Sequence, residues 1–138
     1  MPTDPTKESH TWTGGCACGA VRYEASEAPV FSFHCQCRQC QRATGGGHAS
    51  AFVVRQDTTT VHGEMTFFER TSDRGNIVSS GFCPICGSPM MNRNAAYPEH
   101  LYINAATLDD PGLFRPTAVL FKESAQPWDH IDPDLKAP

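Results

Sequence analysis

Seven cysteines gathered in three short clusters limit how this chain can fold more than any other feature of its sequence. A C-x-C or C-x-x-C step lets a tight turn present two thiolates to one tetrahedral metal ion, with Zn–S bonds of about 2.3 Å. Cysteines that served only as small buried hydrophobic side chains would not gather in this way. The clusters therefore predict metal or redox chemistry. They are Cys16 and Cys18, then Cys35, Cys37 and Cys40, and finally Cys83 and Cys86.

The number of cysteines and the start of the chain both favour metal or redox chemistry over disulfides. An odd number of cysteines disfavours a complete disulfide framework. Residues 1–12 include Asp4, Lys7, Glu8 and two prolines, where a secretory signal would have an apolar stretch. We therefore expect a cytoplasmic protein, because thiols stay reduced in that compartment and remain free to bind metal.

Composition excludes several classes of protein. Leu, Ile, Val and Phe make only 24 of the 138 residues, so bound metal is expected to supplement apolar burial. A net charge of −4 is too small to favour disorder, and a pI of about 5.8 gives no nucleic-acid footprint. No apolar run approaches the ~20 residues that span a bilayer. We expect one domain over residues 12–138, after a flexible tail over residues 1–11, with no nucleic-acid or membrane partner.

Short β-type runs between frequent glycine and proline turns predict an all-β domain, built as a sandwich, a barrel or a coiled sheet. No long window has a helical apolar period, and the one helical turn that we expect covers residues 38–43. Six phenylalanines are expected at alternate core positions: Phe31, Phe33, Phe67, Phe68, Phe82 and Phe121. The predicted strands cover residues 20–25, 30–35, 48–55, 65–71, 76–82, 100–105 and 117–122.

The first and last clusters share a glycine directly after their second cysteine. These glycines, Gly19 and Gly87, let the chain turn with a positive φ and aim backbone N–H groups at sulfur. We therefore pair the two clusters in one closed zinc site. Four protein ligands leave no open position, so this site is expected to be structural. Its ligands are Cys16, Cys18, Cys83 and Cys86.

The middle cluster offers three thiolates and no fourth cysteine. On a loop that closes as a helical turn, Cys35, Cys37 and Cys40 could face one zinc ion from one side. The fourth position would then be held by water, by substrate, or by a histidine such as His34 or His48. Three protein ligands with an exchangeable fourth are typical of catalytic zinc, which deprotonates a bound thiol. The alternatives are a histidine-closed structural site and a cysteine trio that forms a disulfide when metal is lost.

Four further residues near the middle cluster are candidates for binding substrate. Arg38 and Arg42 are spaced i, i+4, so on a helical turn they share a face that suits the carboxylates of a peptide thiol. The alternative is a solvated basic face that offsets the thiolate charge. Gly46 could let the backbone approach a ligand, or could belong only to a tight loop. His48 is a candidate proton shuttle or fourth ligand, and otherwise a partly buried histidine at a strand end.

Three segments resemble, in order, the glutathione-dependent formaldehyde-activating enzyme family, which also includes centromere protein V. They read GGCACGAVRY from residue 14, HCQCRQCQRATG from residue 34 and FCPICGS from residue 82. The segment INAATLDDP, from residue 103, is similar to the one that follows the family's second zinc knuckle. The resemblance covers residues 12–128. It implies a mainly β fold, a coiled multi-sheet β domain with zinc knuckles that is related to methionine-R-sulfoxide reductases.

The same resemblance implies two zinc ions with different tasks. A structural ion would lie on the four outer cysteines, and a catalytic ion on Cys35, Cys37 and Cys40. The implied activity is that of a carbon–sulfur lyase, which forms or cleaves the S-hydroxymethyl adduct of formaldehyde with glutathione or a similar small thiol. The competing interpretations are a non-catalytic zinc-binding interaction module and a thiol redox sensor.

Overall fold

The structure, a computed structural model, describes residues 11–138. Apart from Thr11, the tail predicted over residues 1–11 lies outside the described residues. No described helix is long and apolar enough to cross a membrane. The described elements are β1 (Trp12–Gly15), β2 (Arg22–Ala25), β3 (Phe31–Cys35), α1 (Arg38–Thr44), β4 (Ala49–Arg55), β5 (Thr59–His62), β6 (Thr66–Thr71), β7 (Ile77–Phe82), β8 (Pro89–Asn94), β9 (His100–Asn104) and β10 (Ala118–Leu120), together with four short 3-10 turns.

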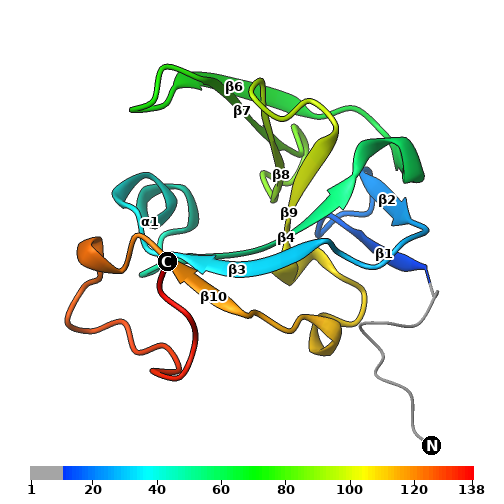
Figure 1. The fold of residues 1–138 in the computed structure, drawn as a ribbon. Helices are drawn as coiled ribbons and strands as arrows, with labels where there is room; N and C mark the ends of the chain where they lie inside the picture. The colour runs from blue at the N-terminus through cyan, green and yellow to red at the C-terminus, as the bar shows by residue number, and fades with distance from the viewer. Residues whose placement is uncertain (1–10) are drawn as a thin grey trace, which may run out of the picture.

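The strands form two sheets (Figure 1). The small sheet has the order β1-β2-β5, and the large sheet has the order β10-β3-β4-β9-β8-β7-β6. Paired strands run antiparallel, except that β10 runs parallel to β3. The mainly β, multi-sheet fold that the sequence predicts is confirmed.

The main core lies between the small sheet and one face of the large sheet. Trp12 and Tyr23 enter it from the small sheet and are fully buried. The ring of Trp12 lies 5.4 Å from that of Phe52 on β4, at an interplanar angle of 52°. Met91 and Ile103 complete the large-sheet side of this core. Aromatic and methionine side chains thus fill core volume that the small number of aliphatic residues could not fill alone.

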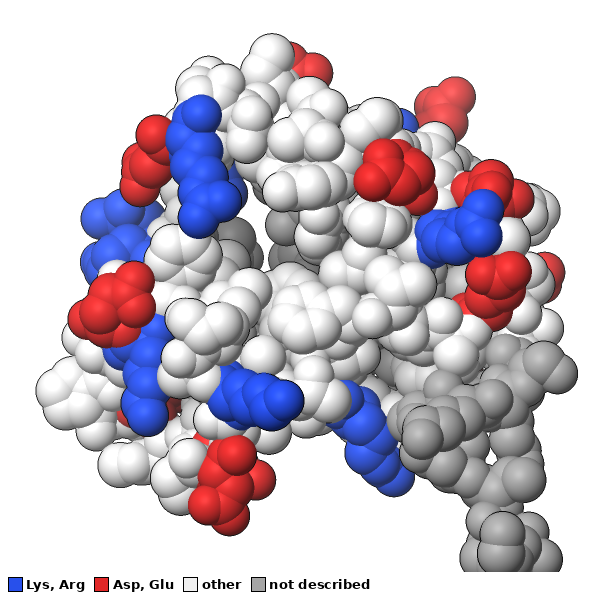
Figure 2. All heavy atoms as spheres, viewed as in Figure 1, with Lys and Arg blue, Asp and Glu red and all other residues white. Residues whose placement is uncertain are grey.

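The opposite face of the large sheet, which carries Cys35, holds a smaller cluster. Side chains alternate across a strand, so Phe33 and Cys35 point away from the main core and meet Ala51 and Val53 of β4. In Figure 1 the sheet curls so that β6 and β7 arch over the side on which α1 lies. We call this the concave face. Figure 2 shows the surface hollowed between the arch and the strands below it.

All seven predicted strands are present with slightly different bounds, and the predicted helical turn is α1. The sequence did not indicate β1, β5 or β8. Two of the four residues of β1 are glycines, β5 is rich in threonine, and β8 opens on a proline. In β1, a Cβ on Gly14 would lie 2.3 Å from both the Thr107 carbonyl oxygen and the Tyr23 hydroxyl. Glycine at this strand position therefore lets the backbone of β1 approach these two residues closely.

The expectation that six phenylalanines fill core positions is wrong for four of them. Phe33 is buried and Phe82 is partly buried. Phe31, Phe67, Phe68 and Phe121 are 39%, 37%, 59% and 50% exposed. Phe67 and Phe68 lie on β6, which is the edge strand, Phe31 and Phe68 point to the concave face, which carries no second sheet, and Phe121 follows the end of β10. Alternation alone does not tell which side of a strand is covered.

Candidate metal centres

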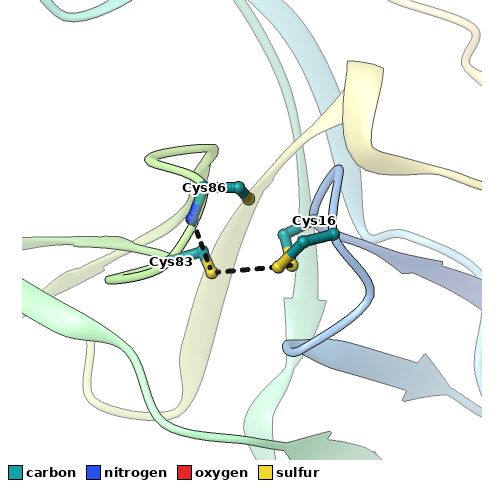
Figure 3. A group of neighbouring side chains, drawn as sticks. Cys16, Cys83 and Cys86 are labelled. Atoms are coloured by element: carbon teal, nitrogen blue, oxygen red, sulfur yellow. Dashed lines mark hydrogen bonds between the residues drawn. The ribbon is translucent and has the colours of Figure 1, made fainter.

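The structure brings together the four outer cysteines at the turns that follow β1 and β7 (Figure 3). Their sulfur atoms all lie within 4.8 Å of one another. The Sγ atoms of Cys16 and Cys18 are 3.6 Å apart, and those of Cys18 and Cys83 are 3.7 Å apart. A disulfide would need about 2.05 Å, whereas sulfurs in a tetrahedral zinc site are about 3.8 Å apart. The donor set therefore fits a tetrahedral ion.

The glycines in the two turns have the positive φ that the sequence argument requires, 82° for Gly19 and 77° for Gly87. The turns also aim backbone N–H groups at sulfur, as the sequence argument predicts: the N–H groups of Ile85 and Val21 donate to Cys83 Sγ and Cys16 Sγ, at 3.4 and 3.2 Å. The N–H groups of the two glycines themselves donate to the carbonyl oxygens of Cys16 and Cys83, at 3.2 and 2.8 Å. The sulfur of Cys16 thus accepts a hydrogen bond from Val21. This hydrogen bond lowers the pKa of Cys16.

Ser88 links the two turns to each other. Its hydroxyl lies 3.1 Å from Cys86 Sγ and accepts the N–H of Ala17 at 3.1 Å. The hydroxyl contact lowers the pKa of Cys86 to about 5. A polar bridge between the turns thus favours the thiolate form, which is the form that binds metal.

Asp109 ties the INAATLDDP segment to the small sheet beside this site. Its carboxylate accepts hydrogen bonds from both terminal nitrogens of Arg22, at 2.8 and 2.6 Å, and from the Thr13 hydroxyl at 2.8 Å. These bonds, the Arg22 bonds first, lower the pKa of Asp109 to about 2. The segment that resembles the family therefore has a structural role in this chain.

The three middle cysteines form a second sulfur group at the end of β3. Cys35 ends the strand, Cys37 caps α1, and Cys40 lies in the first turn of the helix. Their sulfurs lie within 4.8 Å of one another, and Cys37 Sγ accepts the Cys40 N–H at 3.2 Å. Hydrogen bonds from Cys35 and Cys40 lower the pKa of Cys37 to about 2, and the contacts among these sulfurs raise the pKa values of Cys35 and Cys40. A divalent cation would let all three ionise together.

No histidine, aspartate, glutamate or further cysteine among residues 11–138 joins this three-sulfur group. His34 Nδ1 lies 2.8 Å from Ser50 Oγ, and strand alternation places both residues on the face opposite Cys35. The ring of His48 packs edge-on against His34, with 4.7 Å between centroids. Its Nδ1 lies 2.9 Å from both carboxylate oxygens of Asp129. Both histidines therefore belong to a separate polar network.

Asp129 anchors the C-terminal segment against the three-cysteine loop. Its side chain is only 9% exposed, and its carboxylate accepts the Gln36 side-chain N–H at 3.0 Å. Burial raises the pKa of Asp129, but the bonds from Gln36 and His48 outweigh burial and leave it below its ordinary value. A Cβ on Gly47 would lie 2.2 Å from Asp129 Cγ. Gln36 and Asp129 are 93 residues apart, so no local sequence pattern indicated this contact.

Gln41 adds a second tie between α1 and the C-terminal segment. It is 5% exposed, and its side-chain N–H group donates to the carbonyl oxygens of Gln36 and Ser124, at 2.9 and 3.0 Å. Its own amide oxygen accepts from Gln126 at 3.1 Å and from Arg38. The loop that carries the three cysteines is thus held by buried amides.

The remaining predicted substrate contacts lie on α1 and in the loop after it. Arg38 and Arg42 are both exposed, although Arg38 is hydrogen-bonded to Gln41. The N–H of Gly46 donates to the Thr44 hydroxyl at 3.1 Å, within its own loop. As substrate contacts, these residues and His48 stay predictions.

The fold and its two sulfur groups define a β protein with two candidate cysteine metal centres. The family described as "Glutathione-dependent formaldehyde-activating enzyme" matches residues 11–124, and the chain belongs to this family. A Halomonas elongata protein named "Putative glutathione-dependent formaldehyde-activating enzyme" is 30% identical over 125 residues, which cover 86% of this chain and 80% of that protein. A crystal structure of a Rhodobacter sphaeroides protein matches with a TM-score of 0.56 and 26% identity, over 70% of this chain and 87% of that chain.

Proposed function

We propose that this chain is a carbon–sulfur lyase, which forms and cleaves the adduct of formaldehyde with glutathione or a similar small thiol. In this proposal one zinc ion binds the three-cysteine group, and a structural zinc ion binds the four-cysteine group. Membership of the family supports glutathione and formaldehyde as substrates. The observation that carries the proposal is the sulfur group that no other described metal-binding side chain completes. An incomplete set of protein ligands is typical of catalytic zinc.

When bound there, zinc would lower the pKa of an incoming thiol and make its sulfur a nucleophile at neutral pH. The role of the protein would be to hold its three cysteine sulfurs on one side of the reacting sulfur of the substrate. The β3 ladder positions Cys35, and the first turn of α1 positions Cys37 and Cys40. The hydrogen bond from Gln36 to Asp129 restrains the loop between them.

The proposed step balances without an oxidant, a reductant or a further co-reactant. The substrate thiol loses its proton, and its sulfur forms a bond to the carbonyl carbon of formaldehyde. The carbonyl π-bond breaks, and the oxygen takes up one proton to become a hydroxyl group. The reverse sequence releases formaldehyde and the thiol. Arg38 and Arg42 are proposed to bind carboxylates of the thiol, with Gly46 and His48 as further candidate contacts.

A cytoplasmic setting is part of the proposal. All seven cysteines are free, and the cytosol keeps thiols reduced. The same setting supplies glutathione-type thiols as substrates.

The test is the rate of exchange between ¹³C-formaldehyde and its glutathione adduct, followed by NMR exchange spectroscopy against a protein-free background. The zinc-loaded protein is expected to accelerate this exchange, and the Cys37→Ser variant to return it to background with an unchanged circular dichroism spectrum. Equal exchange with and without the wild-type protein would overturn the proposal. A disulfide within residues 35–40 after mild peroxide, found by mass spectrometry together with absent exchange, would favour a redox sensor.

A further inference from the structure

We propose that Arg70 binds a carboxylate of the substrate thiol in a cleft over the concave face of the large sheet. The inference rests on the function proposed above and adds to it a residue that selects thiols carrying a carboxylate. Nothing in the sequence motifs marks Arg70, which lies on β6 outside all three cysteine clusters.

The strand register places the three-cysteine group and Arg70 on the same face of the large sheet. Cys35 and Phe31 alternate on β3 and point to the same face. From Phe31 the pairing continues across five more strands to Phe68 on β6, and directly paired residues share a face. Arg70 lies two residues beyond Phe68 and so points to the face that carries Cys35. The row consists of Phe31, Val53, Tyr102, Asn92, Ser80 and Phe68.

Packing supports this assignment of faces independently of the register. Tyr102 and Cys35 belong to one cluster, together with Val53. Val78, the cross-strand partner of Arg70, is only 8% exposed. Arg70 therefore shares its face with a buried apolar side chain, and arginine commonly lays its aliphatic stem on such surface while its charged head stays in water.

Arg70 combines partial burial with a guanidinium nitrogen that has no hydrogen-bond partner. Among residues 11–138, Arg70 Nε is withdrawn from solvent and has no hydrogen-bond partner. By contrast, Arg22 and Arg55 are paired with aspartates, and Arg93 lies 5.2 Å over the ring of Phe67. A guanidinium group stays charged and presents a planar fork of donors that matches a carboxylate. No described acidic side chain forms an ion pair with this guanidinium group, and a carboxylate ligand would supply that partner at its terminal nitrogens.

The surface between Arg70 and the sulfur group suits a peptide-like thiol. It is concave and hollowed, with Lys or Arg side chains on its rim (Figure 2). Asn92, Ser80 and Tyr102 offer neutral hydrogen-bonding groups along the row, and none of them would repel a carboxylate. Because β6 and β7 arch over the side on which α1 lies (Figure 1), a ligand held at one end by sulfur chemistry would cross the hollow toward β6 rather than follow the whole row.

The experiment compares glutathione with a thiol that has no carboxylate, N-acetylcysteamine, in the ¹³C-formaldehyde exchange assay. The full-length, zinc-loaded protein is used, and Arg70→Met is compared with the wild type. We expect Arg70→Met to raise the KM for glutathione about 10- to 100-fold, the range of one charge-assisted hydrogen-bonded contact, with the KM for N-acetylcysteamine unchanged. Arg70→Lys keeps the charge without the fork and is expected to give an intermediate KM.

Arg74→Met is the matched control, because Arg74 lies in the exposed turn of the same hairpin. It is expected to leave both KM values within about twofold, the usual size of a surface effect. Equal KM values for glutathione in wild type and Arg70→Met, with zinc content and circular dichroism unchanged, would overturn the role of Arg70 and leave the proposed function standing. An equal rise in KM for both thiols would also overturn it, as a structural effect. Absence of exchange with either thiol in the wild type would overturn the proposed function itself, and this inference with it.

Discussion

The two cysteine groups share a ligand chemistry but differ in how the fold builds them. The four-cysteine group joins turns that follow β1 and β7, and two of its members, Cys16 and Cys83, belong to the main core. The three-cysteine group comes from one continuous segment, residues 35–40, at the end of the concave face. The first group offers four sulfurs, enough for a tetrahedral ion, and the second offers three.

This difference separates stability from reactivity. A metal that joins distant segments closes a long loop and removes many conformations from the unfolded chain. A metal bound within six residues closes almost no loop, so it contributes little to global stability. The three-cysteine loop is instead held by Gln36, Gln41 and Asp129, through contacts with the C-terminal segment. The reaction proposed at that group would therefore not require the fold to loosen.

The largest expected effect belongs to the four-cysteine group. Cys83→Ser should remove its metal and lower the free energy of unfolding by roughly 5 kcal/mol or abolish folding, because structural zinc binding is coupled to folding. Zinc content per chain and thermal unfolding by circular dichroism measure this. A Cys83→Ser protein that melts like the wild type would show that the long loop needs no metal.

The matched change in the other group should affect activity instead. Cys37→Ser is expected to reduce formaldehyde–glutathione exchange by more than about 100-fold, since even residues that only support a ligand cost 10- to 100-fold. The unfolding temperature should shift by only a few degrees, because the other contacts of the loop remain. Loss of the folded state would contradict the separation of the two groups.

A third prediction concerns the contacts that hold the three-cysteine loop. Asp129→Asn and Gly47→Ala should each lower the free energy of unfolding by about 1–3 kcal/mol, because each disrupts a mostly buried hydrogen-bonded carboxylate. Hydrogen exchange should increase over residues 121–138 and in the loop. Asp134→Asn, an exposed position in the same segment, is the control and should change neither. Unaltered exchange in Asp129→Asn would show that the segment is held in another way.

The smallest effect is expected at Asp109, beside the four-cysteine group. Its folded pKa of about 2 lies below the ordinary 3.8, so its stabilising contribution is full above about pH 4 and is lost as pH falls toward 2. Asp109→Asn should therefore cost a constant amount between pH 8 and about 5, at most about 1 kcal/mol for this exposed pair. Denaturant unfolding at several pH values tests this. A difference that already fades at pH 6 would contradict the lowered pKa.

The sequence predicted the features that depend on local spacing. The strands, the turn at α1 and the positive φ of Gly19 and Gly87 follow from neighbours in the chain. It did not predict β1, where glycine serves close packing against Tyr23. Strand propensity alone predicts that glycine interrupts a strand.

The surroundings of the three-cysteine group could not be predicted in the same way. Asp129 reaches Gln36 only after the C-terminal segment folds back along β10. Arg70 shares a face with Cys35 only because pairing across six strands sets the register. The exposure of Phe68 has the same origin, since the sequence does not tell which sheet face stays uncovered. These are properties of topology rather than of local pattern.

The central claim is that the three-cysteine group accepts an external thiol. The most direct measurement is the visible absorption of the cobalt-substituted protein, titrated with glutathione and, as a control, with S-methylglutathione. We expect sulfur-to-cobalt charge-transfer absorption to rise and saturate with glutathione, to stay constant with S-methylglutathione, and to lose its glutathione response in Cys37→Ser. A wild-type spectrum that saturating glutathione leaves unchanged would contradict the claim.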